Sequence, residues 1–235
     1  MTYAISDIHG MYDKYLKMLD LINFNDNDTL FVLGDIVDRG DEPIKVLLDI
    51  MNRPNVYPII GNHDLLALDV LKKLNVDITE ENYTTQIDID TMNKLLDWMN
   101  NGGTNTIEQF RKLTNQQRKD ILDYIEEFSF AEVIDVGDKT FIMVHAGLGN
   151  FRKDKKLSEY TIDELLFTRS NPDIKLFDDE DIYVVSGHTP TLKYTGKPEI
   201  IIRNNNIFID CGACFKKGKL GCICLDTMEE FYVEN

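Results

Sequence analysis

The sequence predicts an α/β fold in which short buried strands alternate with helices. Three observations support this prediction: apolar runs of about five residues recur along the chain, amphipathic helical patterns separate the first of them, and several runs end in polar residues beside glycine. Strands alternating with helices indicate a parallel sheet with right-handed crossovers. At 235 residues and 43% hydrophobic content, the chain can bury one substantial core. We therefore predict a single domain over residues 1–235.

The stretch Gly34-Asp35-Ile36-Val37-Asp38-Arg39-Gly40 is the segment around which we expect the chain to be organised. It follows an apolar strand at 29–33 and precedes a helix at 42–51 with Pro43 in its first turn. Open α/β sheets bind ligands in crevices beyond the carboxyl ends of such strands. Taken alone, the stretch could equally be a polar loop with a surface ion pair.

The remaining elements follow from apolar patterns of the same kinds. Strands are expected at residues 2–6, 29–33, 56–60, 140–144 and 182–185. Helices are expected near residues 12–22, 42–51, 65–74 and 162–168, the last with a capping box formed by Thr161 and Glu164.

Residues 65–130 differ from this alternation and indicate a helical insertion within the domain. After the helix at 65–74 comes an acidic polar stretch at 77–90, followed by three further helical patterns. The last of these has a capping box formed by Thr114 and Gln117. We expect the insertion to lie over one edge of the site.

Charge and segment patterns limit the possible partners. A formal net charge of −16 disfavours non-specific binding to nucleic acid or to an anionic membrane surface. The same charge would repel a phosphorylated substrate unless local cations reverse the field at the site. The amino terminus lacks a signal-peptide pattern, and no apolar stretch has the length of a membrane span. We therefore expect a cytoplasmic protein.

The four cysteines, Cys211, Cys214, Cys222 and Cys224, lie near the carboxyl end. The spacing of the first pair raises the possibility of structural zinc. However, residues 207–209 and 220–225 resemble the two strands of a buried hairpin, and cysteine is a common small core residue. We favour reduced core thiols.

All four histidines follow predicted strands and stand beside or within one residue of glycine. They are His9, His63, His145 and His188. Asp7, Asp35 and Asn62 occupy matching strand ends. One such histidine would be unremarkable, but packing does not easily explain all four. Because strand tips meet at one edge of a sheet, these side chains are expected to converge.

Carboxylate, imidazole and amide donors suit a pair of divalent ions such as manganese, iron or zinc. Asp35 lies between the other candidates and could bridge two ions about 3.5–4 Å apart. Such a pair would lower the pKa of a shared water towards neutrality and offset the site aspartates. We expect two divalent metal ions, with manganese favoured.

The motifs Asp-x-His-Gly, Gly-Asp-x-Val-Asp-Arg-Gly and Gly-Asn-His-Asp, followed by His-Ala-Gly and Gly-His-Thr-Pro, match a known family. The sequence resembles the phosphoprotein phosphatase family of metallophosphoesterases, particularly its compact bacterial and phage members. The resemblance runs from residue 6 to about residue 215. It implies a calcineurin-like metallophosphoesterase fold, a β-sheet sandwich flanked by helices.

The resemblance also implies residue roles. One metal would be held by Asp7, His9 and Asp35, and the other by Asp35, Asn62, His145 and His188. His63 would be the general acid, Asp38 the carboxylate that orients it, and Arg39 and Arg169 the phosphate-binding arginines. Ser6 replaces a glycine usual in the family, and Asp64 replaces a more frequent glutamate. Neither is an implied ligand.

Three functions compete. The first is hydrolysis of phosphoserine or phosphothreonine in proteins by a metal-bridging hydroxide without a covalent intermediate. The second is hydrolysis of dinucleoside polyphosphates such as diadenosine tetraphosphate, for which Tyr83, Trp98 and Phe110 are the stacking candidates in the insertion. The third is a non-catalytic binding module, but none of the implied ligands is missing. We favour the phosphoprotein substrate.

Overall fold

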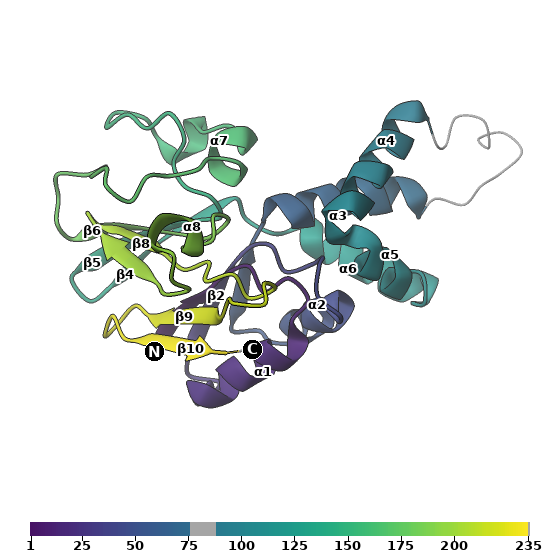
Figure 1. The fold of residues 1–235 in the computed structure, drawn as a ribbon, viewed down its shortest axis with the longest axis horizontal. Helices are drawn as coiled ribbons and strands as arrows, with labels where there is room; N and C mark the ends of the chain where they lie inside the picture. Colours follow the sequence, from purple (N-terminus) through teal and green to yellow (C-terminus); the bar gives the residue numbers. More distant parts are fainter. Residues whose placement is uncertain (76–87, 235) are drawn as a thin grey trace, which may run out of the picture.

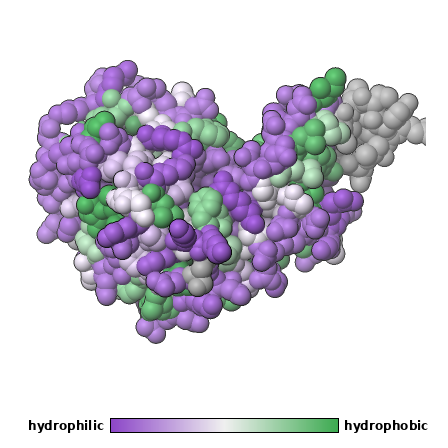
Figure 2. Space-filling view, in the orientation of Figure 1, coloured by the Kyte–Doolittle hydropathy of each residue, from purple (hydrophilic) through white to green (hydrophobic). Residues whose placement is uncertain are grey.

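The computed structural model describes residues 1–75 and 88–234. The acidic stretch predicted at 77–90 therefore lies largely outside the described residues. The chain forms two five-stranded sheets with helices around them, and a group of helices projects to one side (Figure 1 and, in space-filling form, Figure 2). No helix among the described residues is long and apolar enough to cross a membrane.

The first sheet has the strand order β10-β9-β1-β2-β3. Its strands are β1 (Thr2–Ile5), β2 (Thr29–Leu33), β3 (Val56–Ile59), β9 (Leu220–Cys224) and β10 (Glu230–Val233). β1, β2 and β3 are parallel, and α1 (Tyr12–Leu21) and α2 (Pro43–Met51) connect them. This confirms the predicted alternation and brings the carboxyl ends of three strands to one edge.

The second sheet has the order β4-β5-β6-β8-β7. Its strands are β4 (Ala131–Val136), β5 (Lys139–Val144), β6 (Ile182–Ser186), β7 (Ile201–Arg203) and β8 (Asn206–Phe208). β5, β6 and β8 are parallel neighbours, while β4 and β7 pair antiparallel at the two edges. Three short helical segments accompany this sheet: Leu157–Glu159, α7 (Ile162–Leu166) and α8 (Leu192–Thr195).

Period-two alternation divides the side chains of the first sheet between two cores. Ala4 and Phe31 face the second sheet, where they join Phe141, Met143 and Val185 in one buried cluster. The neighbouring residues of β1 and β2 face the other way and pack with α1 and α2. The predicted sandwich flanked by helices is confirmed, and its interior holds the two sheets together.

The insertion forms the projecting group of helices in Figure 1. It contains α3 (Asn62–Leu74), α4 (Ile89–Trp98), a π-helical turn (Met99–Gly103), α5 (Thr104–Phe110) and α6 (Asn115–Glu126). The predicted capping box of Thr114 and Gln117 is present on α6. α3 begins three residues earlier than predicted, because Asp64 accepts a hydrogen bond from Gly61 N and caps the first turn.

The predicted hairpin of residues 207–209 and 220–225 is wrong. β8 pairs with β6 and β7 in the second sheet, whereas β9 pairs with β1 and β10 in the first. Both strands are buried on both faces, so their hydrophobic pattern does not identify the partner. The chain between them crosses from one layer of the sandwich to the other.

The cysteines are free thiols in this arrangement. Cys211, Cys222 and Cys224 are buried, and Cys214 is half-buried. Burial raises the pKa of Cys211 to about 12 and also raises the pKa of Cys222 and Cys214. Among the described residues, no cysteine joins a group of three potential metal ligands. The geometry agrees with core thiols rather than structural zinc.

We therefore expect the native protein at pH 8 to expose at most one thiol to a disulfide reagent such as Ellman's reagent. That thiol is Cys214, and its raised pKa should make its reaction slow because the thiolate is the reactive form. Denaturation in urea should release all four. Rapid reaction of two or more thiols in the native protein would contradict the buried arrangement.

Candidate functional site

The predicted site residues meet where strand ends of both sheets face one another. Asp7 and His9 follow β1, Asp35 follows β2, Asn62 opens α3 after β3, His145 follows β5, and His188 follows β6. Gly34 allows the close approach that this requires. It has φ +80°, and a Cβ there would lie 2.5 Å from Gly61 Cα. Side chains distant in sequence therefore converge as predicted.

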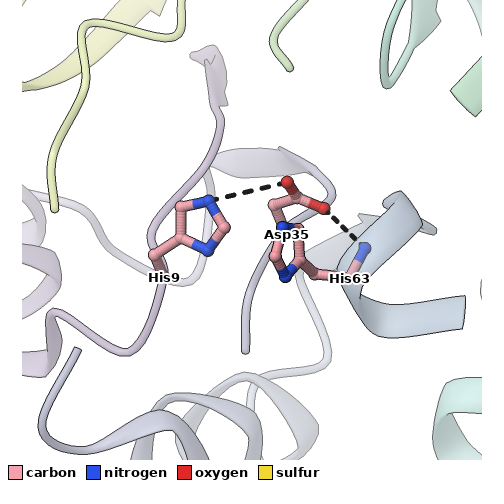
Figure 3. Close-up of side chains that lie close together, drawn as sticks. All are labelled: His9, Asp35 and His63. Carbon is pink, nitrogen blue, oxygen red and sulfur yellow. Dashed lines mark hydrogen bonds and ion pairs between the residues drawn. The ribbon is translucent and has the colours of Figure 1, made fainter. Parts of the chain in front are cut away.

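A first group of potential metal ligands comprises His9, Asp35 and His63 (Figure 3). One ligand atom from each lies within 4.8 Å of the others. His9 Nε2 is 3.5 Å from Asp35 Oδ2, and the backbone N–H of His63 donates to Asp35 Oδ1 at 3.0 Å. The predicted general acid His63 thus lies directly beside two predicted ligands.

A second group comprises Asp35, His145 and His188, again within 4.8 Å of one another. His145 Nε2 is 3.5 Å from Asp35 Oδ1. Asn62 Oδ1 completes this group, at 3.0 Å from His145 Nε2 and 2.9 Å from His188 Nδ1. Asp35 belongs to both groups, which is the arrangement expected of a bridging carboxylate.

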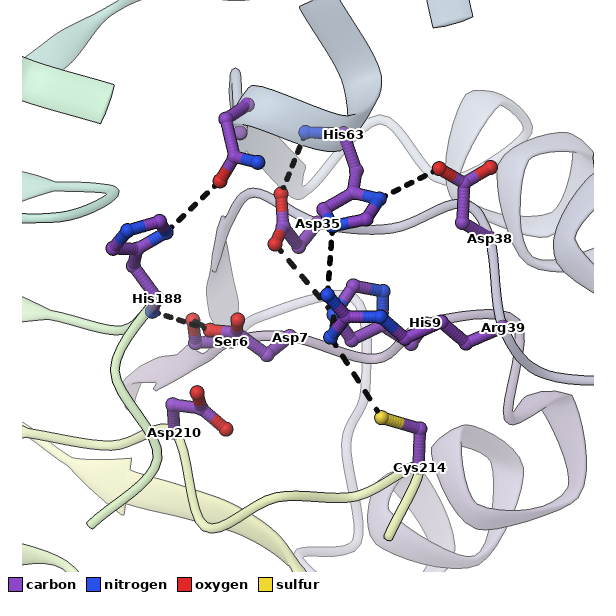
Figure 4. Close-up of polar contacts among 12 residues, drawn as sticks. Ser6, Asp7, His9, Asp35, Asp38, Arg39, His63, His188, Asp210 and Cys214 are labelled. Atoms are coloured by element: carbon purple, nitrogen blue, oxygen red, sulfur yellow. Dashed lines mark hydrogen bonds and ion pairs between the residues drawn. The ribbon is translucent and has the colours of Figure 1, made fainter. Parts of the chain in front are cut away.

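Asp7 is the one predicted ligand that neither group includes. Its Oδ2 accepts hydrogen bonds from the backbone N–H of His188 at 2.9 Å and from the hydroxyl of Ser6 (Figure 4). Ser6, which replaces the usual glycine, therefore orients the Asp7 carboxylate. The ligand role of Asp7 stays a prediction.

Backbone carbonyls orient two of the imidazoles. His9 Nδ1 lies 2.9 Å from the carbonyl of Val37, and His145 Nδ1 lies 2.8 Å from the carbonyl of Leu33. A carbonyl can only accept, so Nδ1 carries the proton in both rings and Nε2 is the unprotonated nitrogen. Ligating histidines in metal sites are held in the same way.

Burial controls the charge of the site. Burial, followed by the charge of Arg39, lowers the pKa of His9 well below its ordinary value. Burial also lowers the pKa of His188, to about 3, with His145 and Arg169 adding to the effect. Burial raises the pKa of Asp35 well above its ordinary value. Metal ligands bind as carboxylates and neutral imidazoles, so a bound cation would stabilise the deprotonated form of Asp35 against this effect of burial.

His63 and Asp38 form the predicted acid pair. His63 Nδ1 lies 2.7 Å from Asp38 Oδ2. Burial opposes the charged ring, but the hydrogen bond to Asp38 and the charge of Asp35 outweigh it, so the pKa of His63 is raised. A carboxylate partner thus keeps the ring able to carry a proton near neutral pH.

The two predicted arginines approach the site from different sides. Arg39 Nη1 is 2.6 Å from His9 Nε2, and Arg39 Nη2 is 2.8 Å from His63 Nε2. Arg169 follows α7, and its Nη1 donates to the hydroxyl of Thr189 at 3.1 Å. Arg169 therefore lies next to His188 and the second group.

The backbone around these residues is strained. Six predicted site residues adopt the left-handed region that non-glycine residues seldom occupy. Their φ values are +50° for Asp7, +46° for His9, +53° for Asp35, +73° for Asp38, +64° for Arg39 and +64° for His188. Each such residue costs roughly 1–3 kcal/mol. Strain of this kind concentrates at functional sites, which independently supports the assignment.

Sequence reasoning missed Asp64 as part of the site's support. Its carboxylate is fully buried and accepts from three backbone N–H groups, those of Gly61 (3.0 Å), Ile36 (3.0 Å) and Val37 (3.2 Å). It thereby ties the loop after β2 to the start of α3. The only signal in the sequence was its place in the Gly-Asn-His-Asp motif.

The proposed stacking residues do not line the site. Trp98 is fully buried, and Phe110 is 3% exposed within the core. Neither ring is available to a substrate base, so this expectation is wrong for both. Helix periodicity explains this, because Trp98 on α4 and Phe110 on α5 each lie on the side of the helix that packs into the core. Tyr83 lies outside the described residues.

Replacing Asp64 by asparagine should lower the free energy of unfolding by about 2–3 kcal/mol, because the amide nitrogen cannot accept from backbone N–H groups. Asp69 on the same helix offers a matched control, since its partly exposed carboxylate pairs, among the described residues, with Lys73 and Lys94. Asp69→Asn should cost less than about 1 kcal/mol. Urea unfolding measures both, and equal losses would contradict the bracing role of Asp64.

In the presence of a chelator, the free energy of unfolding should fall as the pH drops below 6.5. His188 takes up a proton at its ordinary pKa of 6.5 when unfolded, but only at about pH 3 when folded. Its contribution is therefore complete above pH 6.5 and is lost towards pH 3, at up to about 1.4 kcal/mol per pH unit. Urea unfolding at pH 7, 6 and 5 should give a shallower slope for His188→Gln, and an unchanged slope would refute the depressed pKa.

Comparison with known proteins places these features in a family. The model of the calcineurin-like phosphoesterase family matches residues 2–212. A symmetrical bis(5'-nucleosyl)-tetraphosphatase from Proteus mirabilis is 27% identical over 236 residues, covering 97% of this chain and 73% of that protein. The protein of the same name from Wigglesworthia glossinidia brevipalpis is 33% identical over 113 residues, covering 47% of this chain. That match spans only 42% of the relative's own length.

Solved structures agree on the fold. A crystal structure assigned as a candidate diadenosine tetraphosphatase superposes with a TM-score of 0.66 at 18% identity, over 99% of this chain and 92% of the other. A metallophosphoesterase from Sphaerobacter thermophilus gives 0.54 at 17% identity, over 99% and 87%. The expected phosphoprotein phosphatase branch is supported only at the level of the wider family. With its family model matched over most of its length, this chain belongs to the calcineurin-like phosphoesterases.

Proposed function

We propose that this protein is a metal-dependent hydrolase of dinucleoside polyphosphates such as diadenosine tetraphosphate. The observation that carries the proposal is the pair of histidine–carboxylate groups that share Asp35, with the Arg39 guanidinium beside the first group. Similarity over 97% of this chain to a protein named symmetrical bis(5'-nucleosyl)-tetraphosphatase supports the substrate class.

The donor set fits two divalent ions. His9 and His145 direct Nε2 inward, and the shared carboxylate of Asp35 is buried between them. The residues that would hold the ions are Asp7, His9 and Asp35 for one, and Asp35, Asn62, His145 and His188 for the other. Mixed nitrogen and oxygen donors suit manganese, with iron or zinc as alternatives. When bound, such ions supply an activated water and neutralise phosphate charge.

The side chains around the groups provide the remaining chemistry. Arg39 and Arg169 offer planar guanidinium groups, which suit the oxygens of a phosphate chain. His63, paired with Asp38, is the proton donor to the leaving oxygen. The strong negative net charge is offset locally by these two arginines together with the ions.

The loop between β8 and β9 supports a nucleotide substrate. Cys214 Sγ lies 3.9 Å from Arg39 Nη1, and the next three residues, Phe215, Lys216 and Lys217, are exposed. An exposed aromatic ring beside two lysines can stack on a base and contact phosphate. Trp98 and Phe110 are buried, so this loop is a better candidate for base contacts than the insertion. A phosphoprotein substrate, the initial expectation, is not named by either of the two sequence relatives described above.

The test compares two substrates on the purified full chain after metal removal and reloading with manganese. We expect kcat/KM for diadenosine tetraphosphate to exceed that for a phosphoserine peptide by at least about tenfold. Chromatography of the nucleotides should show ADP as the product of symmetrical cleavage.

Asn62→Ala should remove activity together with one bound metal, whereas Asn150→Ala, which alters a surface asparagine bonded to Glu164, should keep both. Faster hydrolysis of the phosphopeptide than of the dinucleotide would overturn the proposed substrate class. Full activity of Asn62→Ala would argue against the metal assignment.

A further inference from the structure

The segment Trp98–Gln109 of the insertion forms hydrogen bonds with every residue of the loop Asp38–Asp41. Arg39 N donates to the carbonyl of Gly102 at 2.9 Å. Two side-chain amides reach the other end of the loop: Asn105 Nδ2 donates to the carbonyl of Gly40 at 2.9 Å, and Gln109 Nε2 donates to the carbonyl of Asp41 at 2.6 Å. The insertion therefore holds the loop that carries the acid pair and one phosphate arginine.

Asp38 receives the most specific of these contacts. Trp98 Nε1 donates to Asp38 Oδ2 at 2.7 Å, and the hydroxyl of Thr106 donates to Asp38 Oδ1 at 2.7 Å. The Thr106 hydroxyl also accepts from the backbone N–H of Asp38 at 3.1 Å, which fixes the direction of its proton. With His63 Nδ1 on Oδ2, both carboxylate oxygens are occupied.

Packing inside the insertion places the two donors that contact Asp38. Trp98 and Thr106 are fully buried, and Gly103 lies against the indole ring. A Cβ on Gly103 would come within 2.6 Å of Trp98 Nε1, so glycine at 103 lets the ring reach Asp38. A tryptophan needed only for packing could direct its N–H to any acceptor. Here the indole N–H and the threonine hydroxyl converge on the carboxylate that holds His63.

We propose that Trp98 and Thr106 are positioning residues that hold the Asp38 carboxylate so that His63 presents its proton to the leaving-group oxygen. The inference rests on the proposed hydrolase function, but it concerns the reaction rather than the choice of substrate. It assigns the helical insertion an indirect part in proton donation, through Asp38 and His63.

The reaction step defines what these residues affect. Water forms the new P–O bond and releases one proton to the solvent, while the bond from phosphorus to the leaving oxygen breaks with its electron pair on that oxygen. The proton from His63 neutralises this oxygen. A leaving group of low pKa departs without that proton, whereas one of high pKa depends on it. Misplacing His63 should therefore slow poor leaving groups most.

The experiment measures kcat and kcat/KM for a series of substituted phenyl phosphates, from dinitrophenyl to unsubstituted phenyl. Thr106→Val removes the hydroxyl at nearly constant volume, Thr106→Ser keeps it, and Trp98→Phe removes the indole N–H. For Thr106→Val and Trp98→Phe, we expect kcat on phenyl phosphate to fall about 10–100-fold. The loss should shrink steadily as the leaving group improves, so the plot of log kcat against leaving-group pKa becomes steeper.

Thr106→Ser should restore most of the wild-type slope. In a His63→Ala background, Thr106→Val should cause little additional loss, since both changes act through the same proton. Metal content and the unfolding midpoint are measured for every variant, which separates a folding defect from a positioning defect. A general loss of packing would lower kcat equally for all leaving groups.

The outcomes distinguish this inference from the proposed function. A wild-type protein that hydrolyses aryl phosphates, with variants that give parallel plots or losses additive with His63→Ala, would overturn the positioning role alone. A wild-type protein active on aryl phosphates but inactive on diadenosine tetraphosphate would overturn the proposed substrate and leave the positioning role to be decided by the slopes. A wild-type protein inactive on both would overturn both.

Discussion

The buried carboxylate of Asp35 is the constraint on which the site depends. It is 2% exposed and lies between two groups of imidazoles, where an isolated negative charge would be costly. The hydrogen bond from the backbone N–H of His63 offsets part of that cost, and bound cations would offset the rest. The left-handed turn at Asp35 and the close contact of Gly34 with Gly61 are what bring this charge to the junction of the sheets.

Strain and support are divided between different parts of the fold. The strained residues lie in loops, and most of the groups that hold them come from other elements. These are the carbonyl at the end of β2, the first turn of α3 and the segment Trp98–Gln109. Asp64 and Thr106 show the principle, because each uses one side chain to satisfy backbone N–H groups of the same loop. The insertion is thus joined to the active-site loop rather than appended to the sheets.

The sequence by itself determined the strand and helix alternation, and from it the convergence of most of the predicted site residues could be expected. Strand ends can be predicted because a buried strand is a short apolar run. The polar residues Asp7, Asp35 and His145 stand within two residues of the ends of such runs. The carboxyl ends of parallel strands lie at one edge of a sheet. The convergence of these side chains could therefore be predicted without knowing the loop structures. Helix caps such as Thr114 with Gln117 are equally local and were also predicted correctly.

The tertiary structure alone decided the contacts that depend on which surfaces meet. The partner of β9 could not be predicted, because a strand buried on both faces has no pattern that distinguishes β8 from β1. Trp98 had the sequence signature of an exposed stacking residue or of a core residue, and only packing against Gly103 turned it towards Asp38. Hydrogen bonds over 60 or more residues leave no periodic trace in a single sequence, since they depend on the relative placement of whole elements.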